Sequence, residues 1–223
     1  MLNSNEERNK NIIFFRKINL NILLILSLYF LTNINSLKID SNKLNKVLLD
    51  QHNKYREMHG VENLTLDNEL IKLAQDYSAV LAYKEDIYSI IPSGNKNKRK
   101  EIVGENIFTC TSILKIPCYE ENSTKPVDDW YNEINFYNYD DPGFTLDTAH
   151  FTQVIWKNTS KIGCGASVRT DGVTYKVVCN YYTAGNIVNP EQYTENVLPI
   201  VEYSEALSFN YIIFILLFLF NIA

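Results

Sequence analysis

The fold is decided by the stretch Ile162-Gly-Cys-Gly-Ala-Ser-Val-Arg-Thr-Asp-Gly-Val-Thr-Tyr-Lys-Val-Val-Cys-Asn-Tyr181. Residues 162–168 and 173–181 are rich in residues that favour strands, and Thr170-Asp-Gly172 between them is typical of a hairpin turn. We therefore predict two antiparallel strands in the last part of the chain.

The segments before this hairpin have helical periodicity. Apolar or aromatic residues at positions 44, 47, 48, 55 and 58 form one stripe of a helix that ends near Gly60. A second helix is expected to follow Asp67, and a third to begin near Thr124 with Pro126 in its first turn. Helices that precede strands predict an α+β domain.

Four cysteines, Cys110, Cys118, Cys164 and Cys179, permit three disulfide pairings. Cys164 and Cys179 flank the hairpin turn, so we expect them to pair across neighbouring strands. Cys110 then remains for Cys118. Zinc binding by these cysteines is disfavoured because no Cys-x-x-Cys spacing is present.

Both ends of the chain are expected to serve targeting. Residues 1–36 are typical of a signal peptide, because Arg16-Lys17 precedes an apolar run at 22–31 that is too short to span a bilayer. The alternative is an uncleaved anchor. Residues 201–223 form a hydrophobic tail, either a membrane anchor or a lipid-anchor signal, and a buried helix is the alternative there. The folded domain should cover residues 37–200.

Export to the cell surface or beyond has two consequences for the domain. Disulfides form in that compartment, and the sequons at Asn63, Asn122 and Asn158 become candidate glycosylation sites. The formal net charge of -5 argues against nucleic acid as a partner, because phosphate binding needs an excess of Lys and Arg.

Three histidines and two acids are the candidate chemical groups. His52 and His59 lie seven residues apart on the first helix, where we expect them at the surface, with a shared metal site as the alternative. His150 precedes an amphipathic aromatic segment. Glu105 and Glu133 have apolar neighbours in the sequence, and each needs a polar partner if it is buried.

Several of these segments resemble the signature motifs of the CAP superfamily, which comprises cysteine-rich secretory, antigen-five and pathogenesis-related proteins. The matching segments are His52-Asn-Lys-Tyr-Arg56, Gly104-Glu-Asn-Ile-Phe108, His150-Phe-Thr-Gln-Val-Ile-Trp156, Gly163-Cys-Gly165 and Cys179-Asn-Tyr-Tyr-Thr-Ala-Gly-Asn186. The resemblance extends roughly from Leu44 to Pro199. Trp130-Tyr-Asn-Glu-Ile134 and Tyr139-Asp-Asp-Pro-Gly-Phe-Thr145 are most similar to the Golgi-associated pathogenesis-related branch.

The resemblance implies a three-layer α-β-α sandwich with a central antiparallel sheet and a cleft that holds two His and two Glu, which bind zinc in several members. Glu105, Glu133 and His150 match three of the four, and we expect them to converge on one cleft. The other histidine should fall in 88–92, where a gapless register gives Ser89. We therefore expect weak zinc binding and no other cofactor, and we favour a hydrogen-bonded cluster over a metal site.

Three functions follow as hypotheses. The resemblance favours a secreted or surface-tethered protein that binds a sterol, fatty acid or other lipid and takes part in extracellular interactions. The second hypothesis is a protein-interaction module with an inert cleft. The third is a hydrolase with His150 as general base, which is disfavoured because no Gly-x-Ser-x-Gly motif is present and the cysteines are expected to be paired.

Overall fold

The computed structural model describes residues 39–83, 93–94, 97, 100–112, 119–120, 122–169 and 172–201. Its elements in chain order are α2 (Ser41–Met58), β1 (Thr65–Leu66), α3 (Asn68–Tyr83), β2 (Gly104–Thr111), α4 (Lys125–Asn132), η1 (Glu133–Phe136), α5 (Ala149–Ile155), β3 (Lys161–Val168), β4 (Thr174–Tyr182) and α6 (Pro190–Asn196). The predicted signal peptide and all but the first residue of the predicted tail lie outside the described residues. Within the described residues, no helix is long and apolar enough to cross a membrane.

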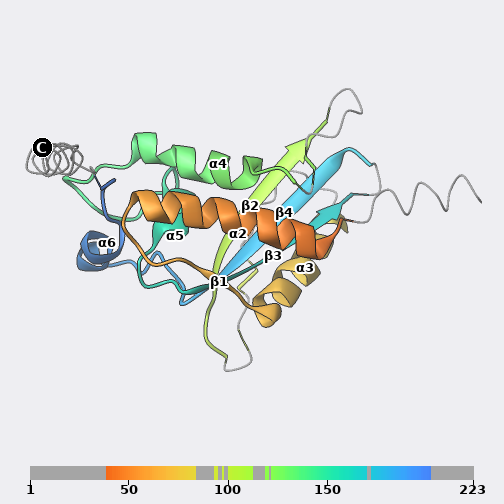
Figure 1. Ribbon diagram of the computed structural model, residues 1–223, viewed down its shortest axis with the longest axis horizontal. Coiled ribbons are helices and arrows are strands. Elements are labelled where there is room, and N and C mark those ends of the chain that lie inside the picture. Colours follow the sequence, from red (N-terminus) through yellow and green to blue (C-terminus); the bar gives the residue numbers. More distant parts are fainter. Residues whose placement is uncertain are drawn as a thin grey trace, which may run out of the picture.

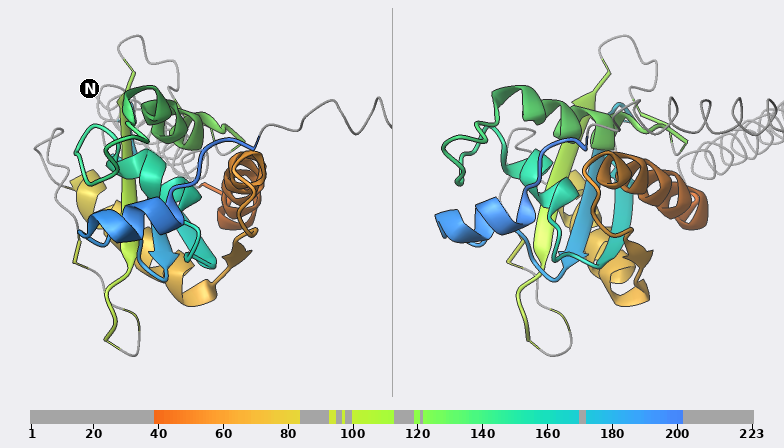
Figure 2. Two further views of the ribbon diagram at one scale, coloured as in Figure 1. Left: turned by 90° about the vertical axis from the view of Figure 1, so that its left-hand side faces the viewer. Right: turned by 60° about the vertical axis from the view of Figure 1, so that its left-hand side comes forward.

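The four strands form one sheet in the order β1-β3-β4-β2. The predicted hairpin is confirmed as β3 and β4, which pair antiparallel, and β2 pairs antiparallel with the other side of β4. Only the two-residue β1 departs from the expected antiparallel pattern, because it runs parallel to β3. α2 and α3 cover opposite faces of this sheet, which gives the expected α-β-α layers (Figure 1; Figure 2).

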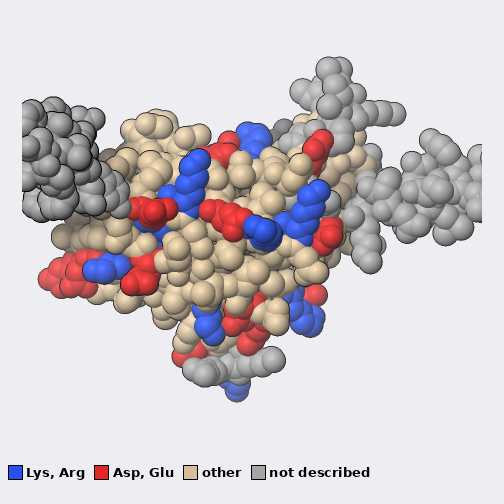
Figure 3. All heavy atoms as spheres, viewed as in Figure 1, with Lys and Arg blue, Asp and Glu red and all other residues tan. Residues whose placement is uncertain are grey.

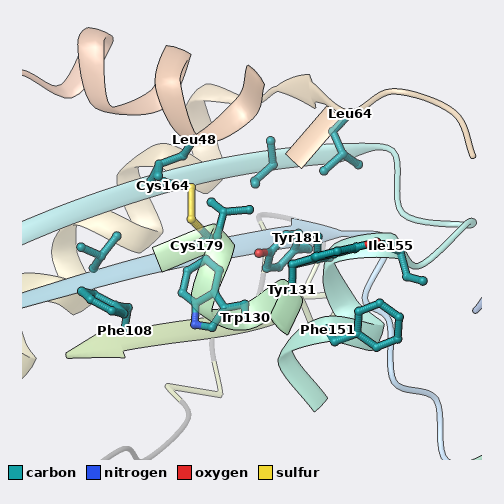
Figure 4. Packing of buried hydrophobic residues seen from close by; sticks show 14 of the residues in the cluster. Leu48, Leu64, Phe108, Trp130, Tyr131, Phe151, Ile155, Cys164, Cys179 and Tyr181 are labelled. Atoms are coloured by element: carbon teal, nitrogen blue, oxygen red, sulfur yellow. A yellow bond between two sulfur atoms is a disulfide. The ribbon is translucent and has the colours of Figure 1, made fainter. Parts of the chain in front are cut away.

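The main core lies between the sheet and the layer of α2, α4 and α5. Cys164 and Cys179 are directly opposite each other in the register and form the predicted disulfide. Figure 4 shows this disulfide beside Leu48, with Trp130 and Tyr181 close by in the same layer. Cys110 is also disulfide-bonded, but Cys118 lies outside the described residues, so their pairing stays a prediction.

The prediction that His52 and His59 lie at the surface is wrong, because both side chains are fully buried. His52 Nδ1 lies 2.7 Å from the Leu48 carbonyl oxygen, to which it donates, and Nε2 lies 2.8 Å from the Tyr181 hydroxyl, from which it accepts. Burial lowers the pKa of His52 to about 4 and also lowers the pKa of His59. The physical reason is that α2 packs against β3 as well as α4 and α5, so its buried surface is wider than one apolar stripe.

Arg56 is a second polar side chain of α2 that is wholly buried. Its Nε donates to the Glu62 carbonyl at 2.7 Å, Nη1 to the Trp156 carbonyl at 2.8 Å and Nη2 to the Thr159 carbonyl at 2.9 Å. Burial lowers the pKa of Arg56 to about 10, so the guanidinium stays charged at neutral pH. The side chain thereby ties the loop after α2 to the segment that follows α5.

Beyond the short β1, the open edge of β3 is closed by side-chain amides. Asn45 donates to the Cys164 carbonyl at 2.9 Å and accepts from the Cys164 N–H at 2.8 Å. Gln75 pairs in the same way with Ala166, at 3.1 Å and 3.2 Å. Each amide therefore replaces one residue of a neighbouring strand.

Gly163 and Gly165 allow α3 to approach β3 closely. A Cβ atom at position 165 would lie 2.2 Å from the backbone nitrogen of Gln75, and one at position 163 would lie 2.1 Å from that of Ile71. Because backbone atoms cannot rotate away, Gly165→Ala should push α3 off the sheet and lower the free energy of unfolding by about 2 kcal/mol. Urea denaturation measures this loss. Gly143→Ala, where a Cβ meets nothing within 4 Å, is the matched control and should change little.

Candidate functional site

A cleft of about 370 Å³ lies beside β2 and the start of α5. The segment before α5 and the loop after β4 complete its walls. Its lining residues are Glu105, Asn106, Ile107, Phe144, Leu146, Ala149, His150 and Asn186. Of the predicted residues, Glu105 and His150 therefore line the same cleft. Glu133 does not line it but is hydrogen-bonded to His150.

Glu133 and His150 form a direct pair. Glu133 Oε1 lies 2.6 Å from His150 Nδ1, and its Oε2 accepts from the backbone N–H groups of His150 and Phe151 at 2.9 Å and 3.1 Å. The imidazole also stacks on Trp130, with ring centroids 6.1 Å apart and an interplanar angle of 16°. Glu133 thus fixes Nδ1 as the protonated nitrogen, which leaves Nε2 of a neutral ring as a hydrogen-bond acceptor.

Glu105 is held by two residues that the sequence reasoning missed. Ser93 donates to it through its backbone N–H at 2.8 Å and its hydroxyl at 2.6 Å, and Asn180 donates through Nδ2 at 3.1 Å. Ser89, the residue predicted for this part of the cleft, lies outside the described residues. Asn180 could have been found from its place in the Cys179-Asn-Tyr181 motif, whereas no pattern marked Ser93.

The amide residues of the signature motifs hold the cleft walls together. Asn106 donates to the His150 carbonyl at 3.1 Å, and Asn186 donates to the Ala149 carbonyl at 2.8 Å. Gln153 accepts from the Gly185 N–H at 2.9 Å, and a Cβ at position 185 would lie within 3 Å of its amide. These contacts fix β2, α5 and the loop after β4 relative to one another.

The described residues do not fit a zinc ion. Structural and catalytic zinc sites use three or four His, Cys, Asp or Glu ligands, and no group of three such residues that could hold a metal is found among the residues described. Both oxygens of Glu133 already accept hydrogen bonds from α5, and Ser93 and Asn180 occupy Glu105. Weak zinc binding stays a prediction.

Catalysis by a nucleophile finds no support in the geometry. A hydroxyl or thiol nucleophile should lie within hydrogen-bond reach of its base. In the described part of the chain, the His150 ring hydrogen-bonds to Glu133 and to no hydroxyl or thiol group. Cys110, Cys164 and Cys179 are all in disulfides.

The three sequons lie on the surface. Asn63, Asn122 and Asn158 are all exposed. The third residues of two sequons, Thr65 and Ser160, are bonded to each other through their backbones at 3.1 Å, so these two sequons lie side by side. Glycosylation itself stays a prediction.

Comparison with known families decides the identity of the fold. Residues 49–181, more than half of the chain, match the family model described as "CAP: Cysteine-rich secretory protein family". The chain belongs to the CAP family. The resemblance to this family that the signature motifs predicted is therefore confirmed.

Two relatives and one solved structure show the extent of this CAP match. The chain is 38% identical to Golgi-associated plant pathogenesis-related protein 1 of Homo sapiens over 162 residues, which cover 73% of this chain and 97% of the human protein. It is 29% identical to salivary antigen-5 of Dipetalogaster maximus, covering 77% of this chain and 74% of that protein. The structure of BmVAL-1 superposes with a TM-score of 0.54 at 20% identity, over 72% of this chain and 84% of that one, and supports the CAP fold.

Proposed function

We propose that this CAP protein is exported and binds a sterol or a similar lipid in the cleft beside β2. The observation that carries the proposal is the mixed lining of the cleft. Phe144 and Leu146 supply large apolar side chains, whereas Glu105, His150 and Asn186 supply polar groups. Such a lining suits an amphipathic ligand with one small polar head.

The charges of the cleft favour a neutral head group over an anionic one. Glu105 lines the cleft and Glu133 is bonded to the lining residue His150, and these two carboxylates would repel the carboxylate of a fatty acid. His150 Nε2, an acceptor in the neutral ring, suits a hydroxyl donor. A sterol hydroxyl therefore fits the cleft better than a fatty acid.

Export is supported by cysteine chemistry and by a relative. Disulfides persist in oxidising compartments, and three described cysteines are disulfide-bonded. The relative from Dipetalogaster maximus is named as a salivary protein. We further propose that residues 1–36 direct export and that the apolar tail at 201–223 tethers the protein to a membrane.

Filling the cleft tests the binding proposal. Ala149→Trp places an indole in the cleft and should weaken binding of a fluorescent sterol in detergent micelles by at least about tenfold, because the ligand loses its space. Val80→Trp adds the same group to the exposed surface of α3 and is the control. Unchanged binding by Ala149→Trp, or no sterol binding by the wild-type protein, would contradict the proposal and leave a protein-interaction module as the better reading.

A further inference from the structure

Four exposed apolar side chains lie on the two segments that contribute Phe144, Leu146 and Asn186 to the cleft lining, and we call them the apolar rim. Phe144 is 45% exposed, Leu146 80%, Ile187 51% and Val188 81%. Phe144 and Leu146 line the cleft themselves, and Ile187 and Val188 follow the lining residue Asn186. Single exposed apolar residues are ordinary, but a group on two segments around one cleft indicates an interaction surface.

Hydrogen bonds hold the two rim segments in place. Thr145 and Thr148, which flank Leu146, are joined through their hydroxyls at 2.7 Å. Asn186, which precedes Ile187, accepts from the Thr152 hydroxyl at 2.6 Å. The four apolar side chains remain exposed to water, so a partner that buries them gains free energy.

The charges near the rim determine which kind of partner fits. No Lys or Arg occurs in residues 126–156 or 177–201, the segments that contain the rim. Asp140, Asp141 and Asp147 are exposed beside it. By contrast, Figure 3 shows basic and acidic side chains interspersed over the face that carries α2 and α4. These two segments therefore supply none of the cations that bind anionic lipids, and their carboxylates oppose such lipids.

We infer that the apolar rim docks onto a zwitterionic lipid surface, with the mouth of the cleft facing the lipid. The inference rests on the proposed lipid-binding function and deepens it. A ligand could then pass between bilayer and cleft without crossing water, where its apolar body is costly to expose. Interfacial docking of this kind needs only side chains that reach the boundary between head groups and acyl chains.

Tryptophan fluorescence tests docking in the full chain on vesicles. The chain has two tryptophans, Trp130 and Trp156, and both are buried. A third tryptophan introduced by Val188→Trp should be quenched by brominated phosphatidylcholine. Val80→Trp, on α3, is the control and should not be quenched although the same tail is present.

Lipid composition and charge provide two further readouts. Replacing part of the phosphatidylcholine by phosphatidylserine at low salt should reduce the quenching of Val188→Trp, because the carboxylates repel the anionic surface. The double variant Ile187→Asp and Val188→Asp should slow uptake of sterol from vesicles by about tenfold or more. It should leave sterol binding in micelles unchanged, since neither residue lines the cleft.

The outcomes separate docking from ligand binding. Equal fluorescence of Val188→Trp with and without brominated lipid, or equal quenching of Val80→Trp, would overturn the docking inference and point to a soluble partner for the rim. Stronger quenching on phosphatidylserine would overturn the preference for zwitterionic lipid. If Val188→Trp is quenched but the wild-type protein binds no sterol in micelles, docking stands and the proposed ligand is wrong.

Discussion

Replacing Arg56 with alanine is expected to lower the free energy of unfolding by about 4 kcal/mol, a large part of the roughly 5–15 kcal/mol of an ordinary domain. The guanidinium is fully buried, and its hydrogen bonds all go to backbone carbonyl groups, including those of Trp156 and Thr159. Its loss removes these hydrogen bonds, although the Trp156 carbonyl keeps the one from the Thr159 N–H, and it opens a cavity between α2 and the end of α5. Urea denaturation followed by circular dichroism measures the change.

The control for this variant comes from the same helix. Lys54 lies two residues before Arg56 and is exposed, so Lys54→Ala should change the stability by less than about 0.5 kcal/mol. Arg56→Lys should fall between the two, because an ammonium keeps the charge but cannot reach all of the carbonyls in one planar arrangement. A stable Arg56→Ala protein would show that the carbonyls find other donors.

Acid is expected to destabilise the domain through its buried histidines. Burial lowers the pKa of His52 from 6.5 to about 4, so between these values the unfolded chain binds a proton that the folded chain does not. The contribution of His52 to the free energy of unfolding, about 3 kcal/mol, is therefore fully present above pH 6.5 and is lost as the pH falls toward 4. His59, whose pKa is also lowered by burial, adds to the loss in the same direction.

Urea denaturation at a series of pH values from 7 to 4 tests this dependence. The variant His52→Gln carries an amide that does not ionise. Between pH 7 and pH 4, its free energy of unfolding should therefore fall by about 3 kcal/mol less than that of the wild-type protein, whatever its stability at pH 7. An equal dependence on pH in the variant and the wild-type protein would show that His52 is not the group responsible.

The hairpin and its disulfide could be predicted because both depend on local sequence. The pairing of β3 with β4 places Cys164 directly opposite Cys179, as the predicted hairpin requires. The buried state of His52 and His59 could not be predicted in this way. It depends on how many neighbours cover α2, and a stripe of apolar residues indicates only the centre of its buried surface.

The contacts of the cleft also include some that the sequence predicts and some that it does not. Glu133 and His150 stand in segments that resemble the CAP motifs, and that resemblance implied that both belong to one cleft. Ser93 contacts Glu105 through a loop whose path the sequence does not encode in any periodic pattern. Ser89, which a register counted from α3 gives, lies outside the described residues and stays a prediction.

The side-chain amides of Asn45 and Gln75 have a consequence for the behaviour of the protein at high concentration. A sheet that leaves a row of free N–H and C=O groups along one side invites a strand from another molecule, which is how edge-to-edge polymers and fibrils begin. Here the backbone groups of Cys164 and Ala166 are already occupied by these amides. The protein therefore resists aggregation along this side of the sheet without a long covering strand.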